Sequence, residues 1–126
     1  MSANDFDSWA LSFQKPWAGF LGWAKCWYEL RGEQLSQFSD DRDQRTNLWP
    51  LCNYTLYLPK SIEQGGYGAH REREIILLHN DGMEDESRYH CFAPLTEELY
   101  YDWCQKLRRC NSLKVATPTQ HARVRY

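Results

Sequence analysis

Hydrophobic and polar residues alternate along much of the chain, a pattern with period two that is typical of β-strands with one buried face. The pattern begins in segment 8–14, where the residues on one face are Trp9, Leu11 and Phe13. It returns between residues 23 and 40, where Arg31-Gly32 predicts a turn between two strands. These segments predict an antiparallel meander of three strands.

The alternation is interrupted by segments with the composition of loops. Lys15-Pro16 predicts the end of the first strand, and the apolar segment 17–22 is expected to form a loop. Segment 39–47 also has loop composition, and the β pattern then resumes in segment 51–58. Three further segments follow, an exposed connection and two strands: 59–71, 72–79 and 88–93.

A single helix is predicted after Pro94. Thr96 suits the N-cap position, and acidic residues in the first turn with basic residues in the last turn match the helix dipole. Leu99, Trp103 and Leu107 repeat every four residues and form one apolar stripe. We expect these three side chains to be structural core residues that close a half-open barrel.

Two segments, in the right order, resemble the pleckstrin homology (PH) domain family. Segment 23–40 is similar to that family's second and third strands, usually W-x-x-R-W-F-x-L-x-G-x-x-L-x-x-F, and Trp103 lies where the family has its helix tryptophan. The resemblance implies an α+β, mainly β fold: a PH-like seven-stranded, two-sheet antiparallel barrel capped by one C-terminal α-helix. By the same resemblance, segment 51–58 supplies the fourth and fifth strands.

Length, composition and charge favour one globular domain. The 126 residues, 42% of them hydrophobic, fit one core. The resemblance places this core at residues 8–112, between an N-terminal extension, 1–7, and a basic C-terminal tail, 113–126. No apolar run approaches the roughly 20 residues of a transmembrane segment, and the first residues lack the pattern of a secretory signal. Five cysteines without a Cys-x-x-Cys pair favour reduced thiols and a cytoplasmic location.

No motif for catalysis is present: the chain has no Gly-x-Ser-x-Gly, no Gly-x-x-x-x-Gly-Lys and no His-Glu-x-x-His. His90 and Cys91 are neighbours on a predicted strand, so their side chains point to opposite faces and cannot form a catalytic pair. The four histidines show no i, i+4 spacing for a metal. The net charge of −2 does not favour nucleic acid. We therefore expect no enzyme, no cofactor, no metal and no nucleic acid partner.

The PH resemblance also implies where a phosphoinositide headgroup would bind: at the open end of the barrel, on a lysine before the first loop and two basic residues of the second strand. Lys15 matches the lysine, but the second-strand pair falls on Ala24 and Cys26, and Lys25 faces the other side. The candidate headgroup residues are Lys15, Lys25, Arg42 and Arg45. Seven acidic side chains in the surrounding loops outnumber these four basic ones, which disfavours a multiply phosphorylated ligand.

The apolar first loop is the second candidate site. Trp17, Phe20 and Leu21 either fold back onto the core or remain exposed as a hydrophobic anchor for a bilayer or a partner protein. The other tryptophans are expected to lie mostly in the core. A basic cluster near the C-terminus could attract anionic lipid, or it could simply be the solvated end of the helix.

These features predict a non-catalytic adaptor or recruitment module of a signalling or cytoskeletal protein that binds mainly a protein partner. The alternative is a phosphoinositide-dependent membrane-targeting domain with weak or atypical headgroup binding. In both cases the chain is expected in the cytoplasm, with a peripheral position at the membrane in the second.

Overall fold

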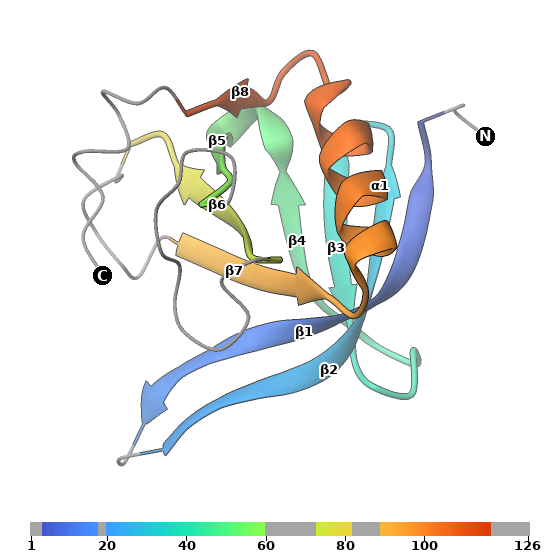
Figure 1. Cartoon of the computed structure of the whole chain (residues 1–126), viewed down its shortest axis with the longest axis vertical. Helices are drawn as coiled ribbons and strands as arrows, with labels where there is room; N and C mark the ends of the chain where they lie inside the picture. Colours follow the sequence, from blue (N-terminus) through green and yellow to red (C-terminus); the bar gives the residue numbers. More distant parts are fainter. Residues whose placement is uncertain (1–3, 18–19, 60–72, 82–88, 117–126) are drawn as a thin grey trace.

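The computed structural model describes residues 4–17, 20–59, 73–81 and 89–116, with the backbone alone for residues 14–17 and 20–21. In these parts of the chain, eight strands form one continuous sheet, and two helices lie between strands along the sequence (Figure 1). The elements are β1 (Phe6–Trp17), β2 (Phe20–Arg31), β3 (Gln34–Phe38), β4 (Arg45–Pro50), the short 3₁₀ helix η1 (Leu51–Asn53), β5 (Tyr54–Tyr57), β6 (Ile75–His79), β7 (Tyr89–Pro94), α1 (Glu97–Arg108) and β8 (Lys114–Val115).

The sheet is bent around a core because β1 belongs to both of its halves. The strand order is β4-β3-β2-β1-β7-β6-β5-β8, and β1 pairs with β2 along its length and with β7 through Ala10–Ser12. All pairings are antiparallel except that between β5 and β8. The predicted mainly β fold with one C-terminal α-helix is confirmed, and the parallel strand β8 is an addition that the sequence did not predict.

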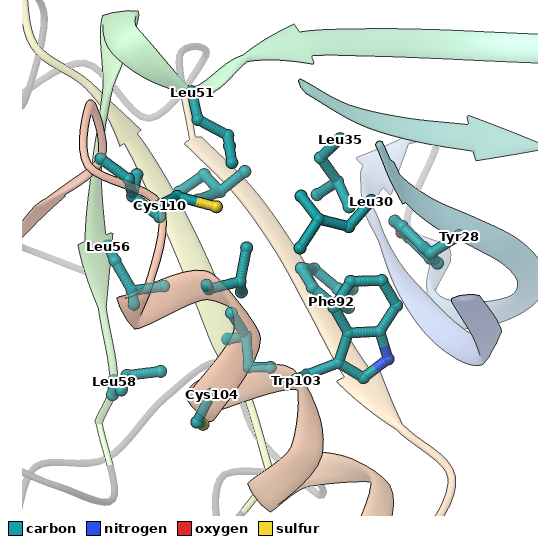
Figure 2. Close-up of a cluster of buried hydrophobic side chains, with 14 of the residues drawn as sticks. Tyr28, Leu30, Leu35, Leu51, Leu56, Leu58, Phe92, Trp103, Cys104 and Cys110 are labelled. Atoms are coloured by element: carbon teal, nitrogen blue, oxygen red, sulfur yellow. The ribbon is translucent and has the colours of Figure 1, made fainter. Parts of the chain in front are cut away.

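Helix α1 covers the inner face of this bent sheet. It begins where predicted, because the Thr96 hydroxyl accepts a hydrogen bond from the Leu99 backbone N–H at 3.1 Å. Trp103 and Leu107 are fully buried and Leu99 is half-buried. The Trp103 indole N–H donates to Ser8 Oγ at 2.7 Å, so a polar contact fixes the ring deep in the core. Figure 2 shows Trp103 beside Phe92, with Leu30 and Tyr28 beyond it.

A second apolar cluster lies on the opposite face of the sheet. Strand β6 is buried on both faces: Ile75 and Leu77 belong to the main core, whereas Ile76 and Leu78 belong to the second cluster. Tyr57 and Cys91 from the neighbouring strands complete the buried part of that cluster, and Phe13 and Trp23 pack against it. This explains why β6 has a continuous apolar run in place of an alternating one.

Two predicted element boundaries are wrong. Strand β1 does not end at Lys15-Pro16 but continues to Trp17, since a register shift between Gln14 and Trp17 accommodates a residue without a backbone N–H. Most of the segment predicted as the first loop is therefore strand, and residues 18–19 lie outside the described residues. Strand β4 lies in 45–50, partly within the predicted second loop, because an edge strand exposed on both faces lacks an alternating pattern. The expectation that segment 51–58 supplies both the fourth and the fifth strand is therefore wrong: residues 51–53 form η1, and only β5 lies in that segment.

Candidate functional site

The inner face of β1 and β2 is the surface on which the PH resemblance places a headgroup. Small or neutral side chains occupy it: Ser8, Ala10 and Ser12 on β1, and Ala24, Cys26 and Tyr28 on β2. Within the described side chains, these two strands contribute no lysine or arginine to the inner face. Since phosphate recognition depends on cationic donors, this surface lacks the main element of a phosphoinositide site.

A network of neutral polar groups fills part of this region. Gln37 Nε2 donates to Ser12 Oγ at 2.9 Å and to the Tyr28 hydroxyl at 3.1 Å, and that hydroxyl lies 2.9 Å from His90 Nε2. Asn47 Nδ2 donates to Gln37 Oε1 at 2.7 Å. The network satisfies its own donors and acceptors across β1, β2, β3, β4 and β7, so it stabilises the barrel without a ligand.

Burial keeps this network uncharged at neutral pH. It lowers the pKa of His90 from 6.5 to about 3, so the imidazole is neutral. It raises the pKa of the Tyr28 phenol well above 10, and it also raises the pKa of the nearby Cys26 thiol. His90 is further enclosed by Trp49, whose ring stacks on it with centroids 4.0 Å apart. Among the described side chains, this region therefore offers no positive charge to an anion.

Three of the four candidate headgroup cations instead gather on the outer face of the sheet. Lys25 Nζ lies 4.8 Å from the ring centroid of Trp9, and Arg42 Cζ lies 3.9 Å from that of Trp27. Arg45 is the cross-strand neighbour of Phe38, which in turn pairs with Trp27. The side chain of Lys15 lies outside the described residues. The three cations thus lie around an aromatic row that crosses β1, β2 and β3.

The expectation that the tryptophans lie mostly in the core needs correction. Trp103 is fully buried, whereas Trp9, Trp23 and Trp27 are half-buried on the outer face of the β1–β2 hairpin. The physical reason is that the inner face must leave room for the Trp103 indole, which contacts Ser8 directly. Small residues at positions 8, 10 and 12 were the available signal, because they alternate with the large ones and mark the inner face.

The hydrophobic anchor residues Trp17, Phe20 and Leu21 lie on strands whose backbone is described, but their side chains lie outside the described residues. The hairpin that carries them extends well beyond the helix-covered part of the sheet (Figure 1). Their role as an anchor stays a prediction.

Comparison with protein-family models and with curated proteins finds no match. Solved structures are similar over most of the chain. The PH domain of human pleckstrin homology domain-containing protein family A member 5 is 15% identical, with a TM-score of 0.60, over 90% of this chain and 80% of that one. The C-terminal PH domain of pleckstrin, in complex with D-myo-Ins(1,2,3,5,6)P5, is 9% identical, with a TM-score of 0.60, over 83% and 92%. The Slm1 PH domain, in complex with inositol 4-phosphate, is 15% identical, with a TM-score of 0.55, over 82% and 92%.

These likenesses show that the chain has a PH domain fold, which confirms the resemblance seen in its second and third strands and in its helix. The helices in the described part of the chain include none long and apolar enough to cross a membrane.

Proposed function

We propose that this chain is a non-catalytic recruitment module of a signalling or cytoskeletal protein and that its main ligand is a partner protein. The observation that carries the proposal is the inner face of β1 and β2, where Ala24 and Cys26 stand at the positions of the expected basic pair. The neighbouring His90 is neutral at pH 7 because burial lowers its pKa to about 3. A multiply charged headgroup would gain no counter-charge from the described side chains of that face, and transferring it from water would be unfavourable.

A second candidate function is membrane recruitment by phosphoinositides with weak or atypical headgroup binding. It is favoured by two of the similar structures, which contain an inositol phosphate. Lys25, Arg42 and Arg45 supply positive charge on the outer face, and Lys15 matches the lysine that precedes the first loop in the family. In either function, we place the chain in the cytoplasm, and in the second it is peripheral at the membrane.

Co-sedimentation with vesicles at physiological salt separates the two functions. The vesicles contain mono-, bis- or trisphosphorylated phosphoinositides, and the proposal expects no saturable binding that prefers one headgroup. Saturable binding abolished in Lys15→Glu/Lys25→Glu would overturn the proposal in favour of a headgroup site. Arg109→Glu/Lys114→Glu makes the same change in charge at exposed positions in the basic cluster near the C-terminus, so binding lost only in this variant would be assigned to that cluster and not to a headgroup site.

The hydrophobic anchor gives an independent test of partner binding. Trp17→Ser/Phe20→Ser should weaken capture of the partner from a cytosolic extract while leaving the circular dichroism spectrum and the thermal midpoint of the domain unchanged. Loss of the folded state would instead assign both side chains to the core. Unchanged capture by a folded variant would exclude the hairpin as part of the partner surface.

A further inference from the structure

The outer face of the β1–β2 hairpin carries two tryptophans with a cation at each end. Trp9 and Trp27 face each other across the two strands, with ring centroids 5.2 Å apart and planes at 73°. Lys25 lies over the Trp9 ring and Arg42 over the Trp27 ring, at 4.8 Å and 3.9 Å from the centroids. We call these four residues the tryptophan–cation strip. Such contacts hold the two cations beside the tryptophan rings.

The two cations of the strip keep their charge available. Both side chains are exposed, and neither has a carboxylate within ion-pair distance in the part of the chain that is described. Arg31, farther along the same face, is in contrast paired with carboxylates: its Nη2 lies 2.6 Å from Asp7 Oδ2 and 3.9 Å from Glu29 Oε1. Glu29 also accepts a hydrogen bond from the Trp27 indole N–H at 2.9 Å, so charge is balanced at that end and not in the strip.

The position of Arg42 is fixed by its turn. Its backbone has φ 64°, a left-handed conformation that is unfavourable for a residue with a Cβ. Its N–H donates to the Ser39 carbonyl at 2.8 Å, and Asp41 accepts bonds from the Ser39 hydroxyl at 2.5 Å and the Asp43 N–H at 2.9 Å. The turn therefore holds the guanidinium above Trp27, where it is ready to contact a ligand.

The residues around the strip favour a narrow ligand over a flat membrane surface. Asp40, Asp41 and Asp43 are exposed in the same turn as Arg42, so a flat anionic bilayer would meet three carboxylates beside the guanidinium. The indole rings are half-buried and each has a cation over it, so they offer little apolar surface for insertion into lipid. An extended peptide covers less surface than a bilayer: lying across the strands, along the aromatic row, it can contact Lys25, Arg42 and the nearby Arg45.

We propose that the tryptophan–cation strip binds an extended acidic segment of a partner protein, with carboxylates paired to Lys25 and Arg42 and apolar side chains against Trp9 and Trp27. This inference rests on the proposed function, because it names the chemistry of the protein partner. The segment would be recognised by charge-assisted hydrogen bonds at fixed spacing, in place of a headgroup inside the barrel.

The test is a titration of the full ¹⁵N-labelled chain, followed by amide and indole N–H resonances. The probe is a short peptide of alternating glutamate and leucine, and the control peptide has lysine in place of glutamate. The acidic peptide should shift the Trp9 and Trp27 indole resonances, with an affinity that falls as salt increases. Lys25→Gln/Arg42→Gln should weaken binding by about tenfold or more, while Arg109→Gln/Lys114→Gln, which also removes two charges, should bind as the parent chain does.

Three results would overturn the inference: no shift with the acidic peptide, equal shifts with the basic peptide, or unchanged affinity in a Lys25→Gln/Arg42→Gln variant whose amide spectrum is that of the folded parent. Shifts of the same indole resonances by phosphatidylserine vesicles would also overturn it in favour of a membrane surface. Headgroup-specific co-sedimentation with vesicles would contradict the proposed function itself. A failed peptide titration without such co-sedimentation would contradict only the binding of an acidic segment to the tryptophan–cation strip.

Discussion

Lowering the pH from 7.5 to 5 should destabilise the domain, and His90 should be responsible for most of the effect. The imidazole is half-buried between Trp49 and Phe92 and bonded to the Tyr28 hydroxyl, and burial lowers its pKa from 6.5 to about 3. Above pH 6.5 the histidine is neutral in both the folded and the unfolded chain, so its stabilising contribution is complete. Below pH 6.5 the unfolded chain binds a proton that the folded chain does not bind, and stability falls.

The size of the loss follows from this difference in pKa. At pH 5 the histidine is almost fully protonated in the unfolded chain and neutral in the folded chain. This difference in protonation lowers the free energy of unfolding by at most about 2 kcal/mol relative to pH 7.5. Partial solvent access to the ring reduces this limit, so we expect about 1–2 kcal/mol. The carboxylates of Glu33 and Asp41 have lowered pKa values because they accept hydrogen bonds from Ser112 and from Ser39, respectively. Their contributions are lost mainly below their ordinary pKa values of 4.5 and 3.8, outside the chosen range.

Urea unfolding at pH 7.5, 6.5, 5.8 and 5, followed by circular dichroism, measures this dependence. In His90→Gln, which keeps a polar group near Tyr28 but cannot titrate, the free energy of unfolding should vary much less across this range. His79→Gln is the matched control, because it removes a histidine outside the network, and it should retain the steep dependence. An equal slope in the parent chain and in His90→Gln would refute the assignment of a buried, neutral imidazole.

Two further predictions concern the helix. Trp103→Phe should lower the free energy of unfolding by about 1–3 kcal/mol. In urea unfolding, a double-mutant cycle with Ser8→Ala should give a coupling of about 1 kcal/mol, because one buried hydrogen bond joins the two side chains. Additive effects of the two substitutions would contradict this contact. Thr96→Ala should cost about 1 kcal/mol by removing the N-cap, and Thr96→Ser should restore most of it, which thermal unfolding can measure; equal losses in both variants would show that the hydroxyl is not the cap.

The helix and the meander of the first three strands could be predicted because their signals are local. Thr96, the charges at the two ends and the four-residue spacing up to Leu107 each identify the helix without any knowledge of the rest of the fold. Two strand boundaries could not be predicted for a different reason. Pro16 usually ends a strand, but a register shift set by the opposite strand accommodates it here. Strand β4 is defined by its pairing with β3, since its exposed side chains have no alternation.

The candidate site was harder to predict because a period of two identifies two faces but does not say which one is inside. Large residues at 9, 11 and 13 suggest a core face, yet the helix approaches the side with the small residues. The loss of the basic pair at Ala24 and Cys26 could be seen from the sequence. The position of Arg42 above Trp27 could not, because it depends on a left-handed residue in a turn.

The docking of α1 also has a consequence for protein synthesis. Residues of α1 and of the segment after it form hydrogen bonds with residues near the start of the domain: Trp103 with Ser8, Ser112 with Glu33, and Asn4 Nδ2 with the Lys106 carbonyl at 2.8 Å. Strands β1–β3 can pair as soon as they leave the ribosome, since their contacts are local. Their inner apolar face must then remain uncovered until α1 emerges. Folding of the domain can be completed only after the last turn of the helix has emerged, and until then the uncovered face of the meander favours aggregation.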